Sequence, residues 1–291
     1  MSDEPEAVVR TTADPTRAGD WALVLAAAGI AHRLAEHDGH FALSVGAPDL
    51  APAEAALAGY DAEPPVTPEP PAPDAGPSVL GILSAAILVV MFFRTGPAAE
   101  GSVWFAAGAA AAQKILAGQW WRLLTALTLH ADLLHLAGNA IACLVFVAPV
   151  GRWLGGGLGA LAILGAAALA NLITALAHRT DFVSVGASTA TFAALGIVAG
   201  LQVVRRLRGE ARRRYAWVPL GAGLGLYAML GVGAGADTYA HLFGLASGAA
   251  IGAGAALGGV KAPRMTVQVL LGAVALAVMA GCWALAFRAA R

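Results

Sequence analysis

Four polar side chains interrupt stretches of sequence that are otherwise apolar. His135 and Asn139 lie near the start of one stretch, Ser188 near the start of a second, and His241 near the start of a third. Together they supply a nucleophile, a candidate general base and two side-chain hydrogen-bond donors. This combination suits attack of an activated hydroxyl on a carbonyl, with donors for the oxyanion that develops.

Each of these residues, taken alone, also has a simpler interpretation. A serine in an apolar helix usually donates to the carbonyl four residues earlier, and an asparagine or histidine often bonds a neighbouring helix. Ser188, Asn139 and His241 would then only hold helices together. The chemical interpretation therefore depends on whether the three stretches bring these side chains to one place.

The composition indicates that the stretches cross a membrane. The 291 residues are 58% hydrophobic and 12% charged, with a mean hydropathy of +0.71, whereas soluble domains carry about 25% charged residues. The net charge is zero, so nothing favours nucleic acid as a partner. Cys143 and Cys282 both lie inside apolar runs, which predicts neither a disulfide framework nor a metal site. No cofactor is expected.

Apolar segments begin at Val79, and we expect seven of them, several near the 20 residues that span a bilayer. They cover residues 79–93, 132–150, 156–177, 186–204, 217–234, 238–258 and 266–287. The connection 94–131 is amphipathic and aromatic, so it is expected to lie in the interface or fold back into the bilayer. The predicted fold is an all-α polytopic bundle of six helices, residues 79–260, with one additional transmembrane helix in 261–291.

The basic residues predict the orientation of this bundle. The segment "RRLRGEARRRY" carries six arginines, and it is predicted to lie on the same side of the membrane as Arg152, Lys261 and Arg264. Nine positive charges there face six on the other side, which places the N-terminus in the cytoplasm and the C-terminus outside the cell membrane. The second, fourth and sixth spans then run inward, with the four polar side chains at one depth, roughly 5–10 Å below the outer helix ends.

Residues 1–61 differ from the rest and predict a small soluble α/β module. "DWALVLAAAGI" predicts a helix with Asp20 as N-cap, "AHRLAEHDGHFALSV" a hairpin turning at Asp38-Gly39, and "APAEAALAGY" a second helix. His32, His37 and His40 lack a ligand spacing and are interpreted as surface residues. The polar, acidic start predicts no cleaved signal peptide. Residues 62–78 are proline-rich and predict an extended linker.

Four motifs, in order along residues 79–260, resemble those of the rhomboid intramembrane serine proteases. "GQWWRLLTALTLH" resembles the Trp-Arg element of the first rhomboid loop, and "HADLLHLAGN" the H-x-x-x-x-H-x-x-x-N pattern. "GAST" resembles G-x-S-x, and "AHLFGLASG" resembles A-H-x-x-G-x-x-x-G. Residues 1–61 also resemble the cytosolic modules that precede some bacterial membrane proteases.

The resemblance implies a role for each matched residue. Ser188 would be the nucleophile and His241 its base, with His135, Asn139 and the Ser188 backbone N–H as the oxyanion hole. Three kinds of residue would have supporting roles. The glycines that leave room near the dyad are Gly186, Gly244 and Gly248, and the aromatic residue against the imidazole is Phe192. The residues that order the first loop are His130, Trp121 and Arg122. Phe192 is equally well explained as core packing.

The activity implied is a serine endopeptidase that cleaves single-span transmembrane proteins near the outer membrane face. Thr189 departs from the commoner G-x-S-G pattern and is interpreted as tuning the oxyanion hole. The alternative is a catalytically inactive relative that binds or sorts transmembrane clients, but such relatives generally lack the serine or the histidine. A transporter is a third interpretation, disfavoured because no half-repeat is evident. The module could bind a cytosolic partner, and membrane lipid surrounds the bundle.

Overall fold

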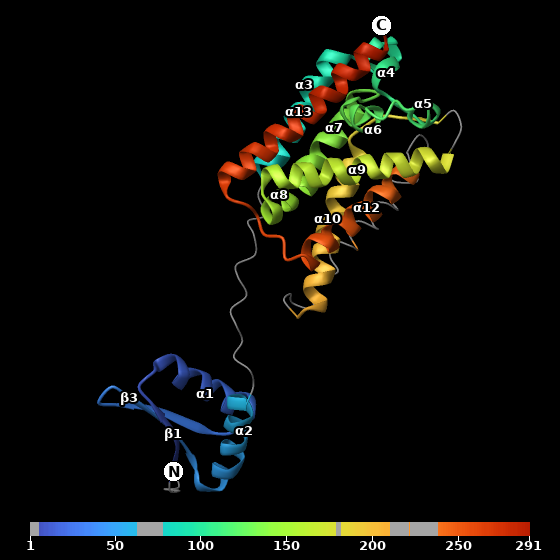
Figure 1. The fold of residues 1–291 in the computed structure, drawn as a ribbon. Coiled ribbons are helices and arrows are strands. Elements are labelled where there is room, and N and C mark those ends of the chain that lie inside the picture. The colour runs from blue at the N-terminus through green and yellow to red at the C-terminus, as the bar shows by residue number, and fades with distance from the viewer. Residues whose placement is uncertain (1–5, 63–77, 179–181, 210–220, 222–237) are drawn as a thin grey trace. The chain divides into compact units, whose positions relative to one another are not determined.

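A computed structural model describes residues 6–62, 78–178, 182–209, 221 and 238–291. The chain divides into two compact units, residues 1–71 and 72–291, which are considered separately (Figure 1). Most of the predicted linker 62–78, all of the fifth predicted span 217–234 except Gly221, and the arginines of 212–214 lie outside the described residues.

The first unit is a three-stranded antiparallel sheet with two helices, in the strand order β1-β3-β2. Its elements are β1 (Glu6–Thr12), α1 (Pro15–Ala27), β2 (His32–His37), β3 (His40–Gly46), the 3₁₀ turn η1 (Ala47–Asp49) and α2 (Leu50–Ala62). The core lies between sheet and helices and is built from Val9, Trp21, Leu25, Leu43, Val45, Ala53 and Leu57. The predicted small α/β module is confirmed, although the sequence analysis missed strand β1.

The hairpin is confirmed in detail, and the predicted helix cap is wrong. Asp38 and Gly39 have φ of 49° and 74°, as a two-residue hairpin turn requires. Helix α1 begins earlier than predicted because Pro15 suits the first helical turn and the Asp14 carboxylate accepts from the N–H groups of Thr16 and Arg17. Asp20 therefore lies within the helix and is not its N-cap.

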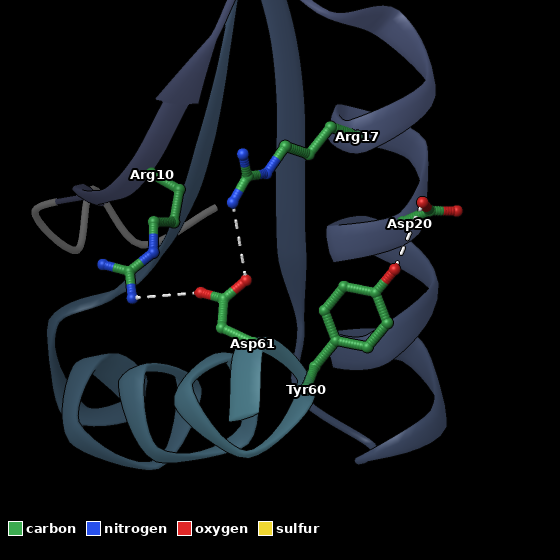
Figure 2. Close-up of polar contacts among 5 residues, drawn as sticks. All are labelled: Arg10, Arg17, Asp20, Tyr60 and Asp61. Atoms are coloured by element: carbon green, nitrogen blue, oxygen red, sulfur yellow. Dashed lines mark hydrogen bonds and ion pairs between the residues drawn. The ribbon is translucent and has the colours of Figure 1, made fainter. Parts of the chain in front are cut away.

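Polar contacts fasten the end of α2 to the rest of this unit (Figure 2). Asp61 forms ion pairs of 3.9 Å with Arg10 and 3.7 Å with Arg17, and the Tyr60 hydroxyl donates to Asp20 at 3.2 Å. Exposed pairs of this kind contribute about 0–1 kcal/mol each. The apolar core, rather than these pairs, must therefore carry most of the stability of the unit.

The second unit is helical, and six of its described helices are long and apolar enough to cross a membrane. They are Val79–Glu100, Leu133–Leu154, Gly156–His178, Ser188–Leu207, Thr238–Leu257 and Met265–Ala289. Six of the seven predicted apolar segments are therefore confirmed as helices, the additional C-terminal one included. Their principal elements are α3 (Val79–Thr95), α7 (Leu133–Ala142), α8 (Ala148–Leu154), α9 (Gly156–His178), α10 (Ser188–Leu207), α12 (Thr238–Leu257) and α13 (Met265–Ala289).

The second span is continuous but contains a π-helical segment, Cys143–Val147, between α7 and α8. Pro149 follows directly at the start of α8. Proline lacks the N–H that an α-helix needs and its ring crowds the carbonyl four residues earlier. The wider π-helical turn accommodates this conflict, so the helix continues across the span.

The connection between α3 and α7 is compact and folds from short elements. They are the 3₁₀ turn η2 (Ala98–Glu100), α4 (Val103–Gly108), β4 (Ala110–Ala111), α5 (Ala112–Leu116), α6 (Arg122–Thr125) and the 3₁₀ turn η3 (Ala126–Thr128). Strand β4 pairs with β5 (Val183–Ser184), which immediately precedes α10. The connection is therefore tied directly to the segment that leads into Ser188.

Candidate active site

Ser188 and His241 meet at the starts of two adjacent helices. Ser188 is the first residue of α10, and His241 lies in the first turn of α12. The Oγ of Ser188 is 2.7 Å from Nε2 of His241, which is hydrogen-bonding distance. His241 is buried while Ser188 is partly exposed. The geometry lets the imidazole accept the serine proton as the hydroxyl attacks.

Glycines on α12 allow the two helices to approach this closely. A Cβ on Gly244 would lie 2.7 Å from the carbonyl oxygen of Thr189, and a Cβ on Gly248 would overlap the carbonyl oxygen of Ala193. A Cβ on Gly252 would likewise overlap the carbonyl oxygen of Ile197. Because these neighbours are backbone atoms, a side chain at these positions would force the helices apart.

Phe192 packs on the imidazole of His241. It lies one turn after Ser188, and the two rings are stacked with centroids 4.6 Å apart and an angle of 21° between their planes. Phe192 is itself buried against Leu195 and Leu245. The ring therefore limits how the imidazole can tilt while offering no competing hydrogen bond.

His135 and Asn139 converge beside Gly186, two residues before Ser188. A Cβ on Gly186 would lie 2.7 Å from Nε2 of His135 and 3.8 Å from Nδ2 of Asn139. Gly186 also has φ of 124°, which residues with a side chain rarely adopt. Glycine at this position therefore brings the backbone that enters α10 against both side chains.

The hydrogen bonds of His135 determine its tautomer. Its Nδ1 accepts from the backbone N–H of Ala131 at 3.3 Å, so this nitrogen carries no proton. A neutral imidazole then has its proton on Nε2, the atom beside Gly186. Asp132 caps α7 by accepting from the His135 N–H at 2.8 Å. Nε2 of His135 is thus a donor directed toward the entry to α10.

Asn139 and the backbone of α10 add further donors. Nδ2 of Asn139 donates to the His135 carbonyl at 2.9 Å, which uses one of its two N–H bonds. The first N–H groups of a helix have no intrahelical partner. At the start of α10 no capping side chain accepts a hydrogen bond from them. Such groups attract negative charge at a helix start.

His130 lies behind His135 and is completely buried. The two rings meet edge to face with centroids 5.2 Å apart. Among the described residues, neither ring nitrogen of His130 has a partner of ordinary hydrogen-bond geometry. Burial, together with the nearby His135, lowers the pKa of His130 to about 4, and a contact with the Thr128 backbone offsets this only in part. His130 is therefore neutral at pH 7.

Trp121 and Arg122 hold the connection in shape by donating to backbone carbonyl groups. The buried Arg122 guanidinium donates to the carbonyl oxygens of Ala109 and Ala106 and to Oε1 of Gln119, each at 2.7 Å. Nε1 of Trp121 donates to the Ala107 carbonyl at 3.3 Å. Both side chains satisfy carbonyl groups at the C-terminal end of α4.

The structure also brings in groups that the sequence analysis missed. The Ala131 N–H and the Asp132 cap fix His135, and only the cap has a sequence signal, an aspartate directly before an apolar helix. Thr189 is buried, and its carbonyl oxygen lies against Gly244. Among the described residues, no three His, Cys, Asp or Glu side chains are grouped to hold a metal ion.

Comparison with known proteins identifies the region that carries this geometry. Residues 117–257 match the family model of the rhomboid domain. The chain is 30% identical over 132 residues to the putative rhomboid protease YdcA of Bacillus subtilis, covering 45% of this chain and 65% of that protein. It is 30% identical over 204 residues to the rhomboid protease GluP of the same organism, covering 67% and 38%.

The chain thus spans less than two thirds of the length of either relative. Every candidate site residue, from Trp121 to Gly248, lies within the matched region, and five of the six spans predicted for residues 79–260 are helices in the described part of the chain. The chain therefore belongs to the rhomboid family.

Proposed function

We propose that this protein is an intramembrane serine endopeptidase that cleaves single-span transmembrane proteins near the outer membrane face. The single observation that carries the proposal is the 2.7 Å contact between Ser188 Oγ and His241 Nε2 at the starts of two membrane-spanning helices. The family and its named protease relatives support the reaction class.

In the proposed mechanism Ser188 attacks the scissile carbonyl while His241 takes its proton. His241 then returns this proton to the leaving amine, and water hydrolyses the acyl-enzyme by the reverse sequence. His135 Nε2–H, Asn139 Nδ2–H and the Ser188 backbone N–H would stabilise the oxyanion. One such donor contributes about 100–1000-fold in rate.

The proposed substrates are helices that must unwind before they can be cut. A transmembrane helix satisfies its own backbone groups and exposes no carbonyl to a nucleophile. Substrates with small or helix-breaking residues near the outer face would therefore be preferred. This placement assumes the orientation from the basic residues, with the N-terminus in the cytoplasm and the cell membrane as the location. We also propose that membrane lipid surrounds the helices and that the module of residues 1–61 binds a cytosolic partner.

Substitution of either dyad residue tests the proposal. Ser188→Ala and His241→Ala should each lower cleavage of a reporter transmembrane substrate in liposomes by at least about a thousandfold, because nucleophile and base act as a unit. Ser84→Ala, in α3 and away from the site, is the matched control and should cleave normally.

A fluorophosphonate probe adds an independent measurement. It should label the wild-type protein on Ser188 and leave the Ser188→Ala variant unlabelled. Full cleavage by either dyad variant would make the assignment wrong. Absence of both cleavage and labelling in the wild-type protein would favour the inactive, client-binding alternative.

A further inference from the structure

Helix α13 lies outside the matched rhomboid domain, and yet it shares apolar clusters with residues on either side of Ser188. Trp283 shares one apolar cluster with Leu129 and Val185, and Val185 is three residues before Ser188. Cys282 shares another with Leu127 and Ala190, which is two residues after Ser188. The C-terminal helix is therefore packed against the surroundings of the site.

The segment that α13 bonds at Thr128, residues 126–131, is itself bonded to the site at two points. The carbonyl oxygen of Ala126 accepts from the Gly186 N–H at 3.0 Å, and this bond holds the backbone that enters α10. The Ala131 N–H donates to His135 Nδ1 and so fixes the Nε2–H tautomer. A displacement of this segment would disturb the nucleophile side and the oxyanion side together.

Trp283 bonds this segment directly. Its Nε1–H donates to Thr128 Oγ1 at 3.2 Å, and the Thr128 hydroxyl donates in turn to the Thr125 carbonyl at 2.8 Å. The indole is buried and lies edge to face with Trp104, with centroids 4.8 Å apart. Gly108 leaves space for it, since a Cβ there would overlap the ring.

The opposite end of α13 is anchored as well. The buried Gln268 accepts through Oε1 from the N–H groups of Gly157 and Leu158 at 2.8 and 3.0 Å, and its Nε2 donates to the Leu154 carbonyl at 2.8 Å. Gln268 thereby caps the start of α9. With both ends bonded, α13 can hold Trp283 at a fixed height against Thr128.

We propose that Trp283 is a positioning residue for the active site, acting through its hydrogen bond to Thr128 on the segment that sets Gly186 and His135. The inference rests on the proposed protease function and deepens it, since it makes the C-terminal helix part of the catalytic unit. Trp283 does not itself touch the reacting atoms. Its loss should therefore slow the chemical step and leave substrate binding nearly unchanged.

Trp283→Phe in the full-length protein tests this, because phenylalanine keeps most of the packing and removes the N–H donor. We expect kcat on the reporter substrate to fall about fivefold, the usual worth of one hydrogen bond, with KM nearly constant. Thr128→Val should cause a similar fall. Thr128→Val also removes the bond to the Thr125 carbonyl. The double variant should therefore be no slower than Thr128→Val alone, in which the bond to Trp283 is already lost.

Trp120→Phe is the matched control, because it makes the same chemical change on an exposed indole of the connection. It should retain the wild-type kcat. Thermal unfolding of each variant measures whether the loss of kcat is explained by a smaller folded fraction. A wild-type kcat for Trp283→Phe, a fall equal to the loss of folded protein, or additive effects in the double variant would each overturn the inference.

Ser188→Ala, assayed in parallel, separates this inference from the proposed function. If the wild-type protein cleaves and Ser188→Ala does not, the function stands, and Trp283→Phe alone decides the inference. If the wild-type protein and Ser188→Ala are equally inactive, both the function and the inference fail.

Discussion

At the scale of single residues, Gly186 is the position where a small change should disturb the site most. Gly186→Ala would place a Cβ 2.7 Å from His135 Nε2, at a backbone φ that alanine rarely adopts. The expected result is a fall in kcat of about a hundredfold, comparable to the loss of one oxyanion donor. The measurement is reporter cleavage together with fluorophosphonate labelling of Ser188.

Gly118→Ala separates backbone strain from crowding. Gly118 also has positive φ, at 98°, but a Cβ there would have no neighbour within 4 Å. This control should lose some thermal stability and keep its kcat. If both variants lost activity equally, strain rather than the crowding of His135 would be the cause.

The four candidate residues Ser188, His241, His135 and Asn139 could be singled out from the sequence because polar groups stand out inside apolar spans. Span direction and helix rise also predicted that they lie at one level of the bundle, with no knowledge of packing. The hydrogen bond from Ala131 could not be predicted, since every residue has such an N–H and only the fold decides where it points. The close approach of Gly186 to His135 was unpredictable for the same reason.

At the scale of elements, the approach of α12 to α10 controls whether the dyad can form. Alanine in place of a helical glycine normally gains about 0.5–1 kcal/mol. Gly248→Ala should instead lower the unfolding temperature, because its Cβ would overlap the carbonyl oxygen of Ala193 and backbone cannot move aside cheaply. Cleavage should fall by about a hundredfold as Ser188 and His241 separate.

Gly254→Ala is the matched control on the same helix, since a Cβ there would meet nothing within 4 Å. This variant should be at least as stable as the wild-type protein and equally active. Equal behaviour of the two alanine variants in unfolding and cleavage would show that close helix contact is not needed.

Elements whose own residues carry an apolar pattern or a turn signal were predictable, and strand β1, which carries neither, was not. The spans and the Asp38-Gly39 turn carry signals in their own residues. Strand β1 lacks a clear alternation of apolar and polar residues in its sequence, and it forms because β3 offers it a partner. Helix α1 begins at Pro15 because an aspartate-proline pair is a stronger start signal than Asp20 within an apolar run. The π-helical segment before Pro149 was also not predictable, because it forms only where the helix continues across the span despite the proline.

At the scale of the whole molecule, every contact that forms the candidate site lies within the unit of residues 72–291. The module has its own core around Trp21, Leu43 and Leu57, and no bond described for Ser188, His241, His135 or Asn139 involves it. Ser78, by contrast, belongs to the membrane unit, because its hydroxyl accepts from the Gly81 N–H and caps α3. The two units should therefore be separable just before Ser78.

We expect a chain lacking residues 1–77 to insert into liposomes and cleave the reporter with the wild-type kcat and KM, since independently folded units keep their own sites. A chain lacking residues 1–78 serves as the comparison, because it also loses the Ser78 cap. Its unfolding temperature should be lower, by a free-energy loss of about 1 kcal/mol. Loss of kcat on removal of 1–77 alone would show that the module takes part in catalysis. A module that only recruits a partner would instead affect cleavage of natural substrates in cells, while cleavage of the purified reporter stayed unchanged.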